Sequence, residues 1–89
     1  MSKIEIYTKS YCPFCHRAKA LLDDYGVAYV EYDLVDHPEL RDEMVRRSGG
    51  GQTVPQILID DQPYGGSDDL AALDRSGNLK SLLNLEATD

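Results

Sequence analysis

The chain has 89 residues and a net charge of −7, and 42% of its residues are hydrophobic. This length suits one domain with a single modest core, spanning residues 1–89, and the apolar content argues against disorder. The acidic excess disfavours binding to nucleic acid and to anionic membrane surfaces, because both attract clustered Lys and Arg side chains.

The first half of the chain predicts a strand and a helix, followed by a second strand and a second helix. Residues Ile4–Thr8 alternate between apolar and polar types, as a half-buried strand does. Pro13 suits the first turn of a helix, and apolar residues then recur at helical spacing until Gly26. Residues 27–34 are rich in β-branched and aromatic side chains and predict the second strand. Asp36 is expected to cap the second helix.

The second half predicts two short strands and two more helices. Pro55 precedes a third strand at Gln56–Ile59, and a turn leads to a fourth strand around Pro63, which suits a sheet edge. Ser67 is expected to cap a third helix, and Asn78 is expected to cap a short last helix.

The predicted order is β-α-β-α-β-β-α-α, which indicates an α/β fold. Strands joined through a helix run parallel, whereas strands joined by a tight turn run antiparallel. We therefore expect a four-stranded mixed sheet flanked by helices. No apolar run is long enough to span a membrane and the first residues lack a signal-peptide core, so we expect a cytoplasmic protein.

Cys12 and Cys15 are the two cysteines of the chain. Two cysteines are too few for a secreted disulfide scaffold, and a bridge that closes so short a segment removes little loop entropy. Cys12 lies just before the first predicted helix, whose unpaired N–H groups favour a thiolate over a thiol. Cys15 lies one turn further on and points inward. We expect Cys12 to attack a substrate disulfide and Cys15 to resolve the mixed disulfide.

Two other interpretations of the cysteines are a zinc site and a pair of inert buried thiols. His16 and His37 add ligand types that suit zinc, but structural zinc usually takes two separated pairs of ligands. His16 follows Cys15 directly, so its side chain turns about 100° away on the helix. A position at a helix start is what a reactive cysteine needs. We therefore expect redox chemistry and no metal.

Four motifs in this order resemble the glutaredoxin family, in its dithiol form, over nearly the whole chain. They are Tyr7-Thr8-Lys9, Cys12-Pro13-Phe14-Cys15, Thr53-Val54-Pro55 and Gly65-Gly66-Ser67-Asp68-Asp69. The resemblance implies a thioredoxin-like fold and a thiol–disulfide oxidoreductase with glutathione as its reductant. It also implies Cys12 as nucleophile, Cys15 as resolving cysteine, and a cis peptide bond between Val54 and Pro55 beside Cys12.

The resemblance further implies a groove that holds glutathione. Lys9 would pair with the glycine carboxylate, and Val54 would exchange backbone hydrogen bonds with the extended peptide. The N–H groups of Ser67 and Asp68 would bind the γ-glutamyl carboxylate, and the Asp68 side chain would take the ammonium. Arg46 or Arg47 could assist. The full predicted set is Lys9, Phe14, Thr53, Val54, Pro55, Gly66, Ser67 and Asp68.

Four features depart from the family pattern, and one of them is Ser67, which stands where a third cysteine often occurs. Phe14 stands where Tyr is more common, Gln52 stands where a basic residue is common, and the loop with glycines 49–51 is one residue longer. Two alternative functions stay open: electron transfer from thioredoxin reductase instead of glutathione, and an iron–sulfur cluster held between two chains. The leading prediction is a monomer whose partners are glutathione and disulfide-containing or glutathionylated proteins.

Overall fold

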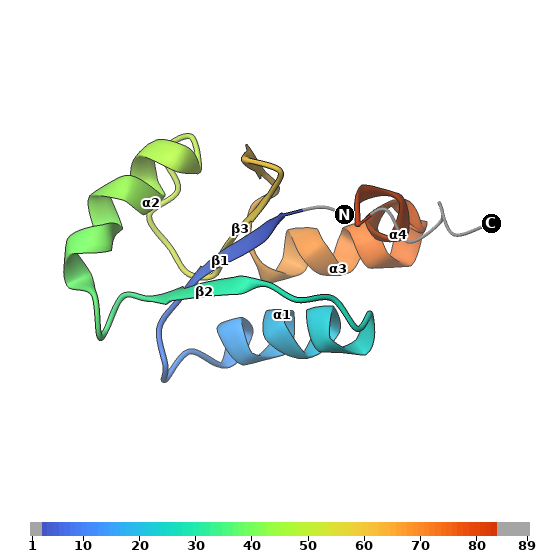
Figure 1. The fold of residues 1–89 in the computed structure, drawn as a ribbon, viewed down its shortest axis with the longest axis horizontal. Coiled ribbons are helices and arrows are strands. Elements are labelled where there is room, and N and C mark those ends of the chain that lie inside the picture. The colour runs from blue at the N-terminus through green and yellow to red at the C-terminus, as the bar shows by residue number, and fades with distance from the viewer. Residues whose placement is uncertain (1–2, 84–89) are drawn as a thin grey trace.

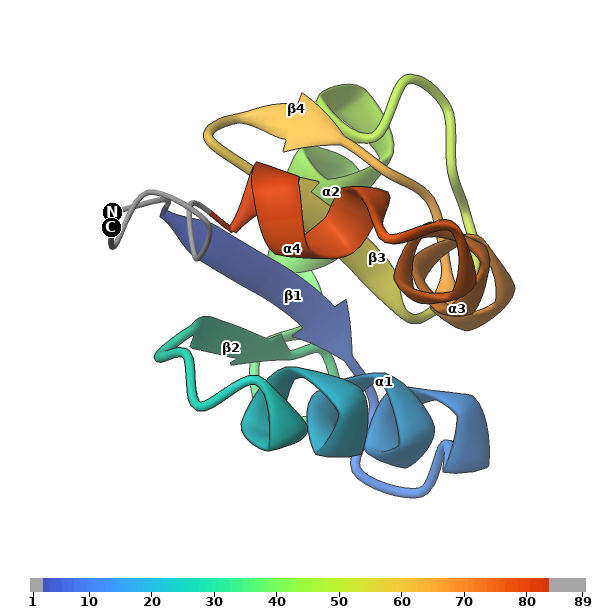
Figure 2. The ribbon, with the colours of Figure 1, turned by 90° about the vertical axis from the view of Figure 1, so that its right-hand side faces the viewer.

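The computed structural model describes residues 3–83 and contains a four-stranded sheet in the order β2-β1-β3-β4 (Figures 1 and 2). Its elements are β1 (Ile4–Thr8), α1 (Pro13–Asp24), β2 (Val30–Asp33), the 3₁₀ turn η1 (Pro38–Leu40), α2 (Arg41–Arg47), β3 (Gln56–Ile59), β4 (Gln62–Pro63), α3 (Ser67–Ser76) and α4 (Asn78–Leu82). This order confirms the predicted α/β fold. No helix within residues 3–83 is long and apolar enough to cross a membrane.

The strand pairing also confirms the prediction. β1 runs parallel to β2 and antiparallel to β3, and β3 runs antiparallel to β4. The β3–β4 turn places Asp60 and Asp61 at positive φ, a conformation that Asp tolerates better than most residues. Pro63 lies in the edge strand β4, where a missing N–H costs no pairing to a further strand.

Helices cover both faces of the sheet, α1 and α3 on one face and α2 on the other (Figures 1 and 2). Alternation along β1 divides the core accordingly, because successive side chains of a strand point to opposite faces. Ile6 packs with Leu22 and Leu70 on the α1 side, whereas Tyr7 packs with Met44 on the α2 side. The turn from β1 into α1 therefore leaves the sheet beside the α1 face, and it carries Cys12.

Arg47, the last residue of α2, ties that helix to the sheet. Its guanidinium donates two hydrogen bonds to the Glu5 carboxylate, at 2.9 and 2.7 Å, and one to the Tyr7 hydroxyl at 3.0 Å. Tyr32 donates a further bond to Glu5 at 2.7 Å. Glu5 is 1% exposed, so these partners satisfy a carboxylate that is removed from water. Its hydrogen bonds from Arg47 hold the Glu5 pKa below its usual range, against the opposing effect of burial.

The structure corrects one strand boundary. The second strand covers Val30–Asp33 and not residues 27–34. Its register with β1 runs from Glu5↔Val30 to Thr8↔Asp33. The β-rich composition of residues 27–29 is therefore used for packing and not for pairing, with Val27 and Tyr29 against the core.

Three predicted helix caps were wrong. Asp36 caps nothing, because His37 precedes the turn Pro38–Leu40, and a residue before Pro disfavours helical geometry. Gly66, not Ser67, is the N-cap of α3. Gly77, not Asn78, precedes α4; its left-handed backbone ends α3 and starts α4 in a single residue.

Candidate active site

Cys12 occupies the N-cap of α1, where Pro13 starts the helix. Its sulfur accepts a hydrogen bond from the Cys15 N–H at 3.3 Å, one of the helix's first donors without an intrahelical acceptor. The Cys12 thiol lies 3.8 Å from the Val54 carbonyl oxygen, to which it donates. Cys12 is partly exposed, so the helix terminus presents its sulfur to solvent beside the segment that precedes β3.

Cys15 lies one turn further along α1 and is 0% exposed. Burial raises the pKa of its thiol to about 12, and the hydrogen bond and negative charge of Cys12 act in the same direction. Cys15 therefore stays protonated at neutral pH while Cys12 is accessible. The two free cysteines therefore differ in exposure, as a nucleophile and a resolving cysteine should.

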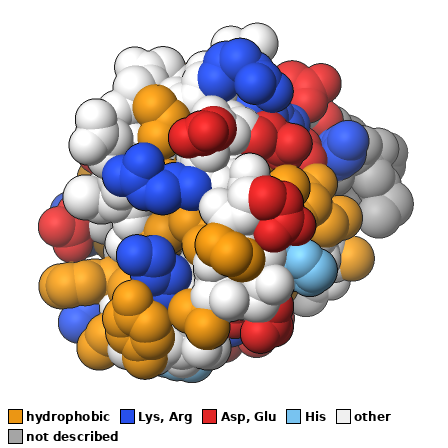
Figure 3. All heavy atoms as spheres, turned by 90° about the vertical axis from the view of Figure 1, so that its left-hand side faces the viewer, with side chains coloured by type: hydrophobic (Ala, Val, Ile, Leu, Met, Phe, Trp, Pro, Cys, Tyr) orange, Lys and Arg blue, Asp and Glu red, His pale blue; other side chains and the backbone are white. Residues whose placement is uncertain are grey.

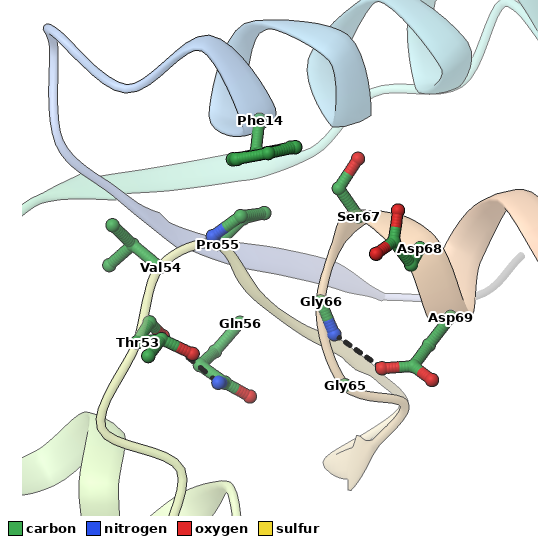
Figure 4. A pocket seen from close by; sticks show the side chains of 10 residues that line it. All are labelled: Phe14, Thr53, Val54, Pro55, Gln56, Gly65, Gly66, Ser67, Asp68 and Asp69. Atoms are coloured by element: carbon green, nitrogen blue, oxygen red, sulfur yellow. Dashed lines mark hydrogen bonds between the residues drawn. The ribbon is translucent and has the colours of Figure 1, made fainter.

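A groove of about 460 Å³ opens between α1 and α3, and it adjoins Cys12 through Val54, whose carbonyl oxygen accepts from the Cys12 thiol (Figure 4). Three separate segments line it: Phe14 of α1, residues 53–56 before and in β3, and residues 65–69 at the start of α3. The Phe14 ring projects from α1 toward Pro55 and Ser67. The Val54–Pro55 peptide bond is cis, as the family resemblance implied.

The start of α3 is organised by Asp69. Its carboxylate accepts a hydrogen bond from the Gly66 N–H at 3.0 Å (Figure 4). Gly65 has a φ of +87°, and a Cβ there would lie 2.2 Å from the same carboxylate, so this position requires glycine. Asp69 thus caps the N-terminus of α3, and Asp68 is left exposed at the groove.

The family model for glutaredoxin matches residues 4–63 of the chain. The chain belongs to the glutaredoxin family. It is 54% identical to glutaredoxin 3 of Escherichia coli K12, over 93% of this chain and 99% of that protein. The solution structure of glutaredoxin from Brucella melitensis is 51% identical to this chain and superposes with a TM-score of 0.77. The match includes 91% of this chain and 87% of the Brucella chain.

The crystal structure of a buckwheat glutaredoxin–glutathione complex superposes on this chain with a TM-score of 0.83 and 28% identity. It covers 93% of this chain and 77% of the buckwheat chain. Membership of the family makes this protein a thiol–disulfide oxidoreductase with a thioredoxin-like fold. Cys12 and Cys15, the Cys-x-x-Cys pair of this glutaredoxin, lie at the start of α1.

The structure brings most of the predicted binding residues of this glutaredoxin together. Lys9 is the exception: it lies in the turn before Cys12, where its carbonyl accepts the Cys12 N–H at 3.0 Å, and does not line the groove. Sequence reasoning missed Gln56, which follows Pro55 directly, and gave no binding role to Gly65 or Asp69 of the fourth motif. The predicted residues that line the groove are Phe14, Thr53, Val54, Pro55, Gly66, Ser67 and Asp68.

The positive charges around the groove differ from those predicted. Arg47 is bound to Glu5 on the α2 face of the sheet. Gln52, at the position where the family commonly has a basic residue, does not line the groove. Arg17 was missed: its guanidinium lies 5.5 Å above the Phe14 ring centre, at the three-residue spacing that places two side chains on one helix face. The end of the molecule formed by α2 and the turn before α1 carries Lys and Arg side chains among apolar and acidic ones (Figure 3).

The predicted zinc alternative depended on His16 and His37. The His16 Nε2 lies 2.8 Å from the Ser10 carbonyl oxygen, and His37 pairs with Glu39 at 3.4 Å. Among residues 3–83, no group of three or more His, Cys, Asp or Glu side chains is arranged to hold a metal ion.

Proposed function

We propose that this glutaredoxin uses glutathione as its reductant and reduces both glutathione mixed disulfides and protein disulfides. The observation that carries the proposal is the groove beside Cys12. Its three lining segments bring a flat aromatic ring, the backbone segment before β3 and a helix N-terminus around one space. The structure of the buckwheat protein is a glutaredoxin–glutathione complex, and its fold superposes on this chain.

Each part of the groove suits one part of a γ-glutamyl tripeptide. Val54 lies outside the strand ladder, so an extended peptide can pair with its backbone. The first N–H groups of α3, at Ser67 and Asp68, suit the γ-glutamyl carboxylate. The Asp68 carboxylate suits the ammonium group. Because the Asp69 carboxylate already accepts the Gly66 N–H, we assign ammonium binding to Asp68.

The reaction follows from the different environments of the two cysteines. The Cys12 thiolate attacks the glutathione sulfur of a mixed disulfide, a Cys12–glutathione disulfide forms, and the substrate leaves as a thiol. A second glutathione attacks this intermediate, releases glutathione disulfide and regenerates Cys12. With a protein disulfide, Cys12 forms a mixed disulfide with the substrate. Cys15 then attacks the Cys12 sulfur, and the second substrate sulfur leaves as a thiol.

A glutathione-coupled reduction assay on matched cysteine variants tests this proposal. We expect Cys12→Ser to abolish activity on every substrate. Cys15→Ser, the same substitution three residues along, should still reduce a glutathionylated peptide but should lose reduction of an intramolecular disulfide. Normal turnover by Cys12→Ser would refute the assignment of the nucleophile.

Two parallel measurements separate the alternative functions. Coupling to thioredoxin reductase in place of glutathione and glutathione reductase should give little turnover, whereas the reverse result would identify a different reductant. Anaerobic reconstitution with iron and sulfide should leave the protein colourless, because we propose an enzyme and not a cluster carrier. We also propose a cytoplasmic monomer, which size-exclusion chromatography and cell fractionation can check.

A further inference from the structure

The reduction of protein disulfides gives Cys15 a difficult task. Its thiol is 0% exposed, and burial raises its pKa to about 12. The thiolate is the nucleophile in disulfide exchange, so the resolving step needs a charge that a buried sulfur disfavours. A cation close to Cys15 would lower this cost.

A chain of polar side chains lies between α1 and the sheet, on the same face as Cys15. The Thr8 hydroxyl donates to the Glu31 carboxylate at 2.7 Å, and the Lys19 ammonium donates to the same oxygen at 2.9 Å. Thr8 ends β1 and is 0% exposed, and Glu31 pairs across the strands with Ile6. Lys19 is four residues after Cys15, which places it on the same face of α1.

The electrostatics of Lys19 and Cys15 are linked. Burial and Cys12 raise the pKa of Cys15, whereas a hydrogen bond with the Lys9 backbone and, more weakly, the positive charge of Lys19 lower it. Hydrogen bonding to Glu31 raises the pKa of Lys19, so the side chain stays a cation wherever the enzyme works. Glu31 thus fixes the position of the ammonium and maintains its charge.

Solvent reaches this pair. A second groove, of about 380 Å³, is lined by both residues, and the side chains of Lys19 and Glu31 are 20% and 31% exposed. Water in this groove can reorganise as the charge on Cys15 changes. The groove is lined by Ser10, His16, Lys19, Glu31, Asp33, Asp36 and His37.

We propose that Lys19, held by Glu31 and Thr8, is a positioning residue for the resolving step. Its ammonium stabilises the Cys15 thiolate that attacks the Cys12 sulfur. The Cys15–Cys12 bond forms, the bond from Cys12 to the substrate sulfur breaks, and the proton lost by Cys15 ends on the leaving thiolate. The dithiol is oxidised by two electrons and the substrate disulfide is reduced. This inference rests on the proposed role of Cys15.

The test compares wild type, Lys19→Gln and Lys19→Arg, each with Cys15 present and in a Cys15→Ser background. Single-turnover reduction of an intramolecular peptide disulfide follows the step that needs Cys15. Turnover of a glutathionylated peptide follows the step that needs Cys12 alone. Urea unfolding shows that each variant is folded, and Lys19→Arg keeps the charge if Lys19→Gln does not fold.

Lys19→Gln should slow the Cys15-dependent reaction by up to about threefold at neutral pH. A rise of about one unit in the Cys15 pKa cuts the thiolate fraction about tenfold, and the greater nucleophilicity of a more basic thiolate restores about threefold. The rising limb of the rate against pH should move to higher pH, and Lys19→Arg should restore the rate. The comparison leaves unchanged the other titratable groups around this site: Cys12, His16, Tyr29, Glu31, Asp33, Asp36 and His37.

The outcomes separate this inference from the function on which it rests. An unchanged rate of peptide-disulfide reduction in Lys19→Gln would overturn the role of Lys19. Equal slowing of the glutathionylated peptide in the Cys15→Ser background would also overturn it, because Lys19 would then act on Cys12 or on the fold. A Cys15→Ser protein that reduces the intramolecular disulfide at the wild-type rate would instead refute the resolving role of Cys15 itself.

Discussion

Replacing Arg47 by Met should destabilise the fold and leave glutathione binding intact. The substitution removes both hydrogen bonds to Glu5 and leaves a 1% exposed carboxylate with the Tyr32 hydroxyl and, at 3.9 Å, the exposed Lys3 ammonium as its remaining partners. Breaking a buried ion pair in this way costs about 3–5 kcal/mol. Arg47 is 22% exposed, so water can replace part of the loss, and we expect about 2–3 kcal/mol.

Urea denaturation and thermal melting measure this loss. A cost of about 2–3 kcal/mol corresponds to about 10–20 °C in Tm for a chain of this size. Glu5 has its pKa lowered in the folded state, so its contribution is present above the unfolded value of about 4.3 and is lost as pH falls through the folded value. The difference between wild type and Arg47→Met should therefore be greatest at neutral pH and shrink in acid.

A double variant provides the control. Glu5→Gln combined with Arg47→Met leaves no buried charge and should recover about 1 kcal/mol or more relative to Arg47→Met alone. In both proteins the KM for glutathione should stay near that of the wild type, since Arg47 lies on the α2 face of the sheet. A raised KM with unchanged stability would refute this reasoning, because it would indicate that Arg47 contacts glutathione.

Three further predictions concern the groove and the cysteines. Asp69→Ala should cost about 0.5–1 kcal/mol in urea unfolding by removing the acceptor of the Gly66 N–H, whereas Asp68→Asn should keep stability and raise the KM for glutathione. Iodoacetamide between pH 7 and about pH 9 should alkylate Cys12 and spare Cys15, as peptide mass spectrometry would show. Phe14→Ala should raise the KM for glutathione while thermal melting stays unchanged, because the ring is 51% exposed.

The sequence predicted the parts of the fold that local pattern determines. Alternation in Ile4–Thr8 and helical spacing after Pro13 located β1 and the start of α1, because burial of one face leaves a periodic signal. The same pattern placed Cys12 at a helix start. Cap residues were less predictable. Ser and Asn are common N-cap residues, but the glycines that precede Ser67 and Asn78 are the N-caps of α3 and α4.

Long-range contacts explain the other errors. Arg47 is bound to Glu5, 42 residues away, and nothing in the local sequence distinguishes it from Arg46. Lys9 is adjacent to the active-site turn in sequence, yet the groove is lined by residues 53–56 and 65–69. The pairing of Lys19 with Glu31 depends on α1 packing over β2 and was not predicted. Such contacts follow from the assembled fold and carry no short-range pattern.

The most direct test of the central claim is to trap the glutathione intermediate. Cys15→Ser incubated with glutathione disulfide should acquire one glutathione, located on Cys12 by peptide mass spectrometry and released by added glutathione. Cys12→Ser, treated identically, should acquire none, because Cys15 is buried. An adduct on Cys15, or the absence of any adduct on Cys12, would contradict glutathione-dependent exchange through Cys12.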